Sequence, residues 1–337
     1  MLRVLYAGSP AASAKALELI LKDSAMSSSM PEQEYKIVGI LTNPPAARGR
    51  HSELIPTDVE SYVRIWNKAR EDDIKIYTPE HIKTEAREEI ALCRPDIFVC
   101  YAYGHILGPK FLSLFKYGAI NLHPSLLPKY RGATPVPQAI LNCDKETGFS
   151  IQKMELGIDE GDILDQEIRR LTGTETSESL LKECTLYGAA SITNILRNLA
   201  KTGKLPPPIP QVGEPSYCTL IKKEDGRINW KWSAERIDAQ IRAYTPWPGC
   251  FTTLNGVSLK IIKARDAAKV ALQDNSVPKN TSAVPGTVIS YNKQRGILIQ
   301  TGDGILIATE LQWQNKKAMD YKSFMNGTRN FLGAVLE

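Results

Sequence analysis

The first two hundred residues alternate short apolar runs with segments of helical periodicity. The apolar runs are typical of buried strands and cover residues 2–7, 35–42, 96–102 and 118–122. Apolar residues recur at helical spacing between them, in residues 11–21, 56–70 and 83–92. Strands and helices that alternate in this way predict an α/β domain with a mostly parallel sheet and crossover helices.

A proline-rich segment separates this part of the chain from one with a different pattern. Residues 179–204 have helical spacing, and the LPPPIPQVGEP stretch that follows has the composition of a stiff, extended linker. Short β-type runs between Gly, Asn and Pro turns come next and predict a small β-barrel. They lie at residues 258–264, 286–292, 296–302 and 304–314. We therefore predict a first domain over residues 1–203, a linker over 204–216 and a second domain over 217–337.

The composition is that of an ordinary soluble protein. Of the 337 residues, 42% are hydrophobic and 23% are charged, and no apolar run approaches the roughly 18 residues that a membrane span requires. The 6 cysteines are scattered without a C-x-x-C pair, which favours reduced thiols, a cytoplasmic location and no metal site. The chain opens directly on a strand pattern rather than on a signal segment. Nothing in the sequence demands more than a monomer.

Positive charge is concentrated in the last third of the chain. From Pro206 onwards 17 Lys and Arg stand against 11 Asp and Glu, a net charge of +6, whereas residues 1–205 carry 25 against 26, or −1. A solvated surface and a face that binds a polyanion both explain this excess.

The stretch NLHPSLLPKYRG, residues 121–132, combines polar side chains with a stiff loop. It continues a buried strand, in which side chains alternate between faces. Asn121 and His123 therefore share one face, and Ile120 and Leu122 share the other. The carboxyl end of such a strand is where ligands bind in parallel α/β sheets. Taken alone, an Asn-x-His pair fits a structural role better than a catalytic one.

A carboxylate in a glycine-rich turn is the second candidate for chemistry. In MELGIDEGDIL, residues 154–164, a strand ends and Asp159 follows between Gly157 and Gly161. Asp and Gly favour turns, so a structural explanation is sufficient for this segment alone. The alternative is that Asp159 orients and charges His123, as carboxylates do in catalytic pairs.

Read together, these segments resemble a known family. NLHPSLLPKYRGATPVPQAI followed by MELGIDEGDIL is similar to the formyltransferases that use 10-formyltetrahydrofolate, with their pattern Asn-x-His-x-Ser-Leu-Leu-Pro and later Gly-x-Asp-x-Gly-Asp. The resemblance covers essentially the full length and is greatest to members that act on tRNA, through VLYAGSP, LTNPPAARGRHSEL, YAYGHIL, DGRINWKWSAERIDAQIRAYTPWPG and LQWQNKKAMDYKSF. It implies a Rossmann-like formyltransferase domain followed by a small OB-type β-barrel domain.

The resemblance also implies an activity and its catalytic side chains. The enzyme would move a formyl group from its co-substrate, 10-formyltetrahydrofolate, to the α-amino group of methionine on initiator tRNA, for translation initiation. Asn121 would donate to the developing oxyanion and His123 would transfer protons. Asp159 would orient His123 and raise its pKa.

The same resemblance places the folate in a loop beside these residues. The folate-binding loop would consist of Ser125, Leu126, Leu127 and Pro128. The YAYGHIL segment, residues 101–107, would help to wall the pocket.

The implied contacts with tRNA lie elsewhere in the chain. Arg50 falls at the family's arginine position in the PPAARGRHSEL loop, although an acidic Glu53 stands where members often carry further basic residues. Lys223 matches a basic position of the second domain, whereas Leu220 occupies one that is often Lys. We expect the tryptophans of this domain to be packing anchors rather than platforms for bases: Trp230, Trp232 and Trp247.

Two other functions stay open on the sequence alone. A formyltransferase of the same superfamily that acts on an amino sugar would keep Asn121, His123, Asp159 and the Ser-Leu-Leu-Pro loop, without needing the arginine loop or a basic second domain. A tRNA-binding protein without catalysis would explain the basic domain. It would leave the three polar side chains without a purpose.

Overall fold

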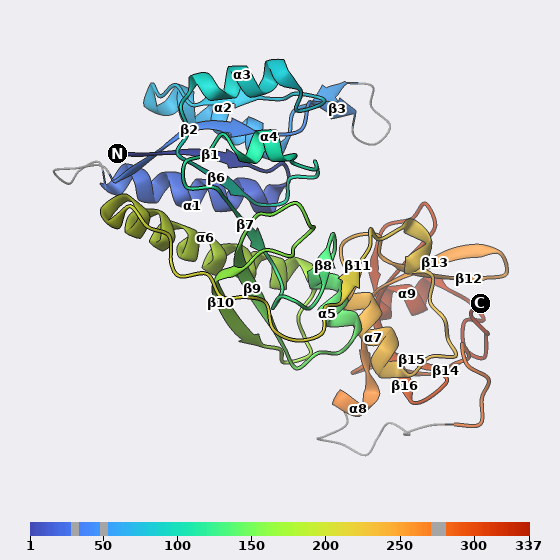
Figure 1. The fold of residues 1–337 in the computed structure, drawn as a ribbon. Helices are drawn as coiled ribbons and strands as arrows, with labels where there is room; N and C mark the ends of the chain where they lie inside the picture. The colour runs from blue at the N-terminus through green and yellow to red at the C-terminus, as the bar shows by residue number, and fades with distance from the viewer. Residues whose placement is uncertain (28–33, 48–52, 271–280) are drawn as a thin grey trace. The chain divides into compact units, whose positions relative to one another are not determined.

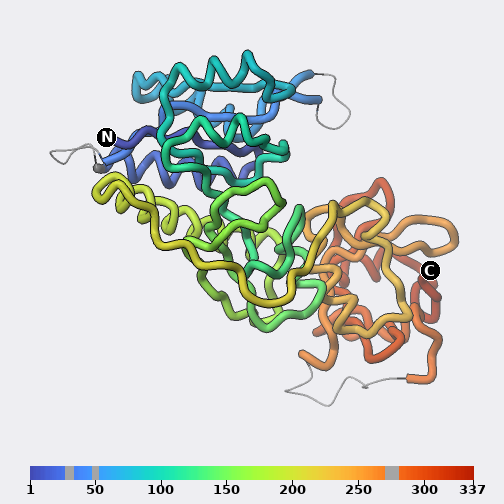
Figure 2. The backbone as a smooth tube through the Cα atoms, in the orientation of Figure 1, coloured from blue at the N-terminus to red at the C-terminus, as the bar shows by residue number. Residues whose placement is uncertain are grey.

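The computed structural model describes residues 1–27, 34–47, 53–270 and 281–337, and its backbone forms two compact units (Figure 2). Unit 1 comprises Met1–Gly132, Thr147–Arg169 and Leu181–Tyr217. Unit 2 comprises Ala133–Glu146, Arg170–Leu180 and Cys218–Glu337.

This division differs in detail from the domains predicted from the sequence. The change of unit after Tyr217 lies beside the predicted start of the second domain, but residues 204–216 belong to unit 1 rather than to a separate linker. Two segments inside the predicted first domain group with unit 2, one of which forms a helix that packs on a helix of the C-terminal part. The boundaries 1–203, 204–216 and 217–337 therefore stay a prediction.

Unit 1 is built on a mostly parallel, Rossmann-like sheet with the strand order β10-β9-β7-β6-β1-β2-β5 (Figure 1). The strands are β1 (Leu2–Ala7), β2 (Tyr35–Leu41), β5 (Lys75–Tyr77), β6 (Ile97–Cys100), β7 (Ala119–His123), β9 (Glu146–Lys153) and β10 (Ile163–Arg170). Neighbours from β7 to β5 pair in parallel, and β9 joins β7 antiparallel. The parallel sheet predicted from the apolar runs is confirmed.

Helices cover both faces of this sheet: α1 (Ala11–Ser27), α2 (Asp58–Arg70), α3 (Thr84–Leu92), α4 (Pro109–Leu112) and α6 (Ser177–Thr202) (Figure 1). One face carries an apolar cluster in which Ala119 of β7 is buried together with residues of α3 and α4. On the other face α6 approaches closely, because a Cβ on Gly188 would lie only 2.5 Å from Leu122 Cδ1. Alternation along β7 therefore directs Asn121 and His123 to the α3-α4 side.

The ends of these helices follow from local sequence. Thr57 begins α2 as its N-cap, with its hydroxyl accepting from Glu60 N at 3.1 Å, and Lys68 and Arg70 occupy the last turn. The sequence KDSAMSSSMPEQE, residues 22–34, predicts an enlarged loop after the first helix, but α1 continues to Ser27, so the helix covers the first part of that stretch. Residues 28–33 of that stretch lie outside the described residues, as do residues 271–280 of a second surface loop that the sequence predicts near residues 268–285.

Unit 2 contains an antiparallel sheet with the order β12-β13-β16-β15-β14, and β17 pairs with β16. Its strands are β12 (Cys250–Leu254), β13 (Val257–Asp266), β14 (Val288–Asn292), β15 (Gly296–Gln300), β16 (Ile305–Trp313) and β17 (Met319–Asp320). Its helices are α5 (Pro135–Leu141), η1 (Lys223–Gly226), α7 (Ala234–Ala243), α8 (Ala267–Val270) and α9 (Tyr321–Gly327). Strand pairing among the described residues does not close this sheet, so the antiparallel strands are confirmed and an OB-type barrel is not.

The tryptophans of unit 2 differ in their surroundings. Trp230 is buried and its indole N–H donates to Thr252 Oγ1 at 2.9 Å, which confirms a packing role. Trp232 lies under Arg236, whose guanidinium carbon is 4.1 Å from the ring centroid. Trp247 is 60% exposed, so the packing prediction is wrong for this residue. Among the described helices, none combines the length and the apolar composition that a membrane crossing needs.

Candidate active site

The carboxyl end of β7 brings together the three side chains singled out in the sequence. Asn121 and His123 leave the strand on one face, and Asp159 reaches them from the turn between β9 and β10. Asn121 Nδ2 lies 3.4 Å from Asp159 Oδ1, and His123 Nδ1 lies 3.4 Å from Asp159 Oδ2. A carboxylate, an imidazole and an amide therefore share one edge of the parallel sheet.

Further donors hold the carboxylate of Asp159 in place. Gln152 Nε2 donates to Oδ1 at 2.7 Å, and the backbone N–H of Gly132 donates to Oδ2 at 2.8 Å. The backbone of Asp159 is in the left-handed region, with φ of 55°, which is uncommon for a residue other than glycine. The same turn has no room for a side chain at Gly161, where a Cβ would lie 1.9 Å from Lys153 O.

His123 is buried, and its two ring nitrogens have different surroundings. Nε2 lies 2.8 Å from the carbonyl oxygen of Tyr130. A carbonyl can only accept, so Nε2 carries the proton of this bond and Nδ1 faces Asp159. Burial, the largest effect, lowers the pKa of His123 below its ordinary value, while Asp159 and the bond to Tyr130 raise it. The predicted effect of Asp159 thus has the right direction, but burial outweighs it.

Sequence reasoning missed Gln152, which belongs to this site. It is buried on β9 directly opposite Asn121 in the antiparallel register, and it reaches Asp159 through its amide N–H. Among the described residues, its Oε1 is buried without a hydrogen-bond partner. The local sequence FSIQKM mixes apolar and polar residues, so it neither singles out Gln152 nor indicates its partner.

The predicted folate loop, residues 125–128, comes just after β7, and hydrogen bonds to other groups of unit 1 hold it in place. The backbone N–H of Ser125 donates to His123 O at 2.9 Å, and Ser150 Oγ donates to Ser125 O at 2.7 Å. Leu127 N donates to Ser150 Oγ at 3.2 Å, and Gln166 Nε2 donates to Leu127 O at 3.1 Å. These bonds fix the loop next to the histidine.

The YAYGHIL segment, residues 101–107, follows β6, the neighbour of β7. Tyr103 packs in the apolar core of unit 1, with its ring centroid 5.1 Å from that of His105, and its buried hydroxyl has no partner among the described residues. Ile106 in the same segment is 85% exposed. The segment therefore presents both a buried polar atom and an apolar surface.

The two predicted tRNA contacts, Arg50 and Lys223, are distant in the sequence from Asn121, His123 and Asp159. Arg50 falls outside the described residues, in a segment flanked by the antiparallel pair β3 (Ala46–Ala47) and β4 (Leu54–Ile55). Lys223 is exposed in η1 of unit 2, and Leu220 close to it is 74% exposed.

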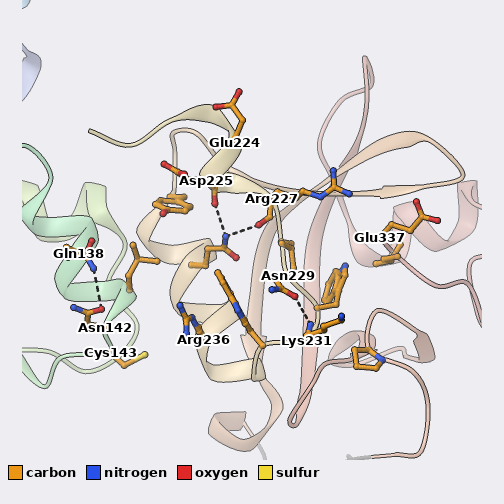
Figure 3. A pocket seen from close by; sticks show the side chains of 18 of the residues that line it. Gln138, Asn142, Cys143, Glu224, Asp225, Arg227, Asn229, Lys231, Arg236 and Glu337 are labelled. Carbon is orange, nitrogen blue, oxygen red and sulfur yellow. Dashed lines mark hydrogen bonds between the residues drawn. The ribbon is translucent and has the colours of Figure 1, made fainter. Parts of the chain in front are cut away.

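A cavity of about 1010 Å³ lies in unit 2, among residues of α5, η1 and α7 (Figure 3). Side chains of both charges line it, with Arg227, Lys231 and Arg236 against Glu224 and Asp225. None of the three side chains at the end of β7 contributes to it. Nor does the described part of the chain gather His, Cys, Asp or Glu into a group that could hold a metal ion.

Comparison with known proteins agrees with this geometry and gives it a class. The family model described as formyl transferase matches residues 13–192, and the model of the formyl transferase C-terminal domain matches residues 220–329. The chain is thus a formyltransferase. Its Rossmann-like domain brings Asn, His and Asp together at one strand end, and the second domain follows.

Full-length relatives then narrow the class. The methionyl-tRNA formyltransferase of Treponema denticola is 40% identical over 341 residues, covering 100% of both chains. That of Treponema pallidum subsp. pallidum is 36% identical over 330 residues, covering 97% of each. This chain belongs to the methionyl-tRNA formyltransferase family.

A solved structure supports the fold alone. The N-formyltransferase of Helicobacter canadensis, in complex with folinic acid and dTDP-3-aminofucose, has a TM-score of 0.61 at 23% identity, covering 93% of this chain and 100% of that one.

Proposed function

We propose that Asn121, His123 and Asp159 carry out the formyl transfer of this family. The enzyme moves a formyl group from 10-formyltetrahydrofolate to the α-amino group of methionyl-tRNA, for the initiation of translation. The observation that carries the assignment is the meeting of the three side chains at the end of β7, with 3.4 Å from Asp159 to both partners.

The reaction sets three demands that these residue types meet. An amine must be neutral to attack the formyl carbon, the formyl oxygen gains negative charge, and the folate nitrogen leaves with a proton. The Asn121 amide has two N–H donors, of which one points to Asp159. The other serves the formyl oxygen, a contribution on the order of 3 kcal/mol for one such donor.

His123 accepts the proton of the attacking amine through Nδ1 and passes it to the folate nitrogen that leaves. Its lowered pKa supports a neutral imidazole in the resting enzyme, and the proton on Nε2 is held by Tyr130 O. Asp159 beside Nδ1 then stabilises the imidazolium that forms. Proton transfer of this kind contributes roughly 100-fold to 10,000-fold in rate.

The folate and amine are placed by neighbouring groups. We assign the folate to Ser125, Leu126, Leu127 and Pro128, because this internally bonded loop follows His123 directly. Buried Gln152 Oε1 is an acceptor without a protein partner among the described residues, and it suits a donor such as the N–H of the amine.

We assign tRNA binding to Arg50 and to unit 2. The net charge of +6 from Pro206 onwards and the exposed Lys223 support an electrostatic contact with phosphates. An OB-type barrel remains our proposal for the antiparallel sheet, since that architecture places such a surface on its strands. We further propose a cytoplasmic monomer; the cytoplasmic location is supported by the six cysteines, none of which forms a disulfide in the described part of the chain. Measurement of the molar mass in solution tests the monomer.

The test uses 10-formyltetrahydrofolate labelled in the formyl group, with charged initiator tRNA, an aminosugar nucleotide or no acceptor. We expect label on methionyl-tRNA, and His123→Ala should lower turnover at least about 100-fold with little change in the affinity for either substrate. The exposed His81→Ala is the matched control and should keep full activity. Label on the amino sugar instead would favour the other formyltransferase, and near-normal turnover of His123→Ala would remove the assignment.

A further inference from the structure

The turn that carries Asp159 is bonded to the proline-rich segment by one side chain, that of Gln211. Gln211 Nε2 donates to Asp159 O and to Gly161 O, each at 2.8 Å. Its Oε1 accepts from Arg131, at 3.2 Å from Nε and 2.8 Å from Nη2. An amide offers two N–H donors and two acceptor lone pairs, so Gln211 uses all of them here. All of these residues belong to unit 1.

Arg131 connects Gln211 to the turn a second time, through the side chain of Glu160. Its Nη1 lies 3.2 Å from Glu160 Oε1, between the two residues that Gln211 binds. The next residue in the chain, Gly132, donates its backbone N–H to Asp159 Oδ2 at 2.8 Å. The backbone and the carboxylate of Asp159 are therefore held by one connected set of hydrogen bonds.

The turn needs such support because of its backbone conformation. A φ of 55° at Asp159 costs on the order of 1–3 kcal/mol for a residue other than glycine, and it persists only where the surroundings hold it. If the Asp159 carbonyl were released, the turn could relax toward commoner dihedral angles. The Asp159 carboxylate would then move away from His123 Nδ1, because it belongs to the same residue as the released carbonyl.

The segment that presents Gln211 is itself fixed. Ile209, between Pro208 and Pro210, pairs with Ile163 at the start of β10 through N–H to O distances of 2.8 and 2.9 Å in the two directions. The prolines restrict the backbone further. Gln211 therefore reaches the turn from a stiff segment that is paired with the start of β10.

We propose that Gln211 is a positioning residue for formyl transfer, which holds the Asp159 turn in the conformation that orients His123. This proposal rests on the catalytic role proposed above for Asp159. The proline-rich segment is then part of the scaffold of the active site as well as a connection between two parts of the chain.

The first test compares Gln211→Ala and Gln211→Glu with Val212→Ala in the full-length enzyme. Glu keeps the length of the side chain and an acceptor for Arg131, but it lacks the two N–H donors. Both Gln211 variants should lower kcat about 10-fold to 100-fold, as expected for a small misplacement of a catalytic group, with KM for folate and for tRNA within a few fold. Val212, the 84% exposed neighbour, should tolerate Ala without effect.

The second test asks whether Gln211 acts through Asp159. In an Asp159→Asn background, adding Gln211→Ala should reduce the residual kcat by less than about twofold, because the group that it positions is already disabled. A thermal melt of each variant checks folding, and Gln211→Glu keeps the experiment informative if Gln211→Ala does not fold.

The outcomes separate this inference from the proposed function. Normal kcat in both Gln211 variants, together with a strongly impaired Asp159→Asn enzyme, overturns the role of Gln211 and leaves that of Asp159 intact. A full-sized additional loss in the Asp159→Asn background, or normal activity of Gln211→Glu alone, also overturns it. Near-normal turnover of Asp159→Asn contradicts the proposed function itself.

Discussion

Replacing Asp159 with Asn should lower turnover at least about 100-fold while leaving substrate affinity almost unchanged. The substitution keeps the shape of the side chain and removes its charge, 3.4 Å from His123 Nδ1. At an effective dielectric constant of about 20, opposite unit charges at this distance attract by about 5 kcal/mol. If somewhat more than half of this attraction, roughly 2.7 kcal/mol, is expressed in the transition state, the rate falls about 100-fold.

The same substitution should lower the pKa of His123 further below its ordinary value. Burial lowers this pKa and remains in the variant, whereas the carboxylate that raises it is gone. NMR titration of the imidazole signals measures the change, and assignment is practical because the chain has 4 histidines and His123→Ala removes one signal. Asp73→Asn is the matched control, since that side chain is 82% exposed.

Two results would refute this reasoning. Turnover of Asp159→Asn within a few fold of the parent enzyme would show that the carboxylate does not act on the reaction. An unchanged or raised pKa of His123 in the variant would show that the charge of Asp159 does not reach the imidazole.

Three further predictions concern stability and tRNA. Burial lowers the pKa of His123 in the native chain, so as the pH falls below about 6.5 the unfolded chain takes up a proton at this residue before the native chain does. The free energy of unfolding should therefore decrease as the pH falls through this range. Urea unfolding at several pH values should show a smaller decrease for His123→Gln, and an equal decrease would contradict the prediction. Arg50→Ala should slow formylation of charged tRNA while folate binding, measured by calorimetry, stays the same; unchanged formylation would make that segment a passive loop. Lys223→Ala should reduce the slope of log affinity for tRNA against log salt by about 0.7 to 0.9, and an unchanged slope would exclude a phosphate contact at this residue.

The sequence was informative where structure depends on neighbours along the chain. Strands such as β1 and β7 and helices such as α2 were predictable because apolar periodicity and an N-cap are local features. The common face of Asn121 and His123 followed from strand alternation. In the structure each of these side chains lies 3.4 Å from the carboxylate of Asp159. The resemblance to a family supplied Asp159 as their partner, which spacing alone left open.

Features that depend on distant parts of the chain could not be predicted in this way. Gln152 belongs to the site because β9 pairs antiparallel with β7, and nothing in its local sequence indicates that register. The net direction of the His123 pKa depends on how completely the fold buries the ring, a quantity that no motif contains. The pairing of Ile209 with Ile163 likewise fixes a segment that the sequence indicated to be a linker, and no local feature predicts that pairing.

This docking changes how the chain should be divided to test tRNA binding. From the sequence, a cut near Pro207 predicts a first part that still binds folate and binds tRNA far more weakly. In the structure that cut also removes Ile209 and Gln211, and with them the bonds that hold the Asp159 turn. Loss of formyl transfer in the truncated protein would therefore not show that the second domain is needed for tRNA.

Substitutions in the full chain avoid this ambiguity, because Lys223→Ala leaves the turn untouched while Gln211→Glu leaves the basic surface of unit 2 untouched. If the two roles are separate, the first should alter only the salt dependence of tRNA binding, and the second should alter only kcat.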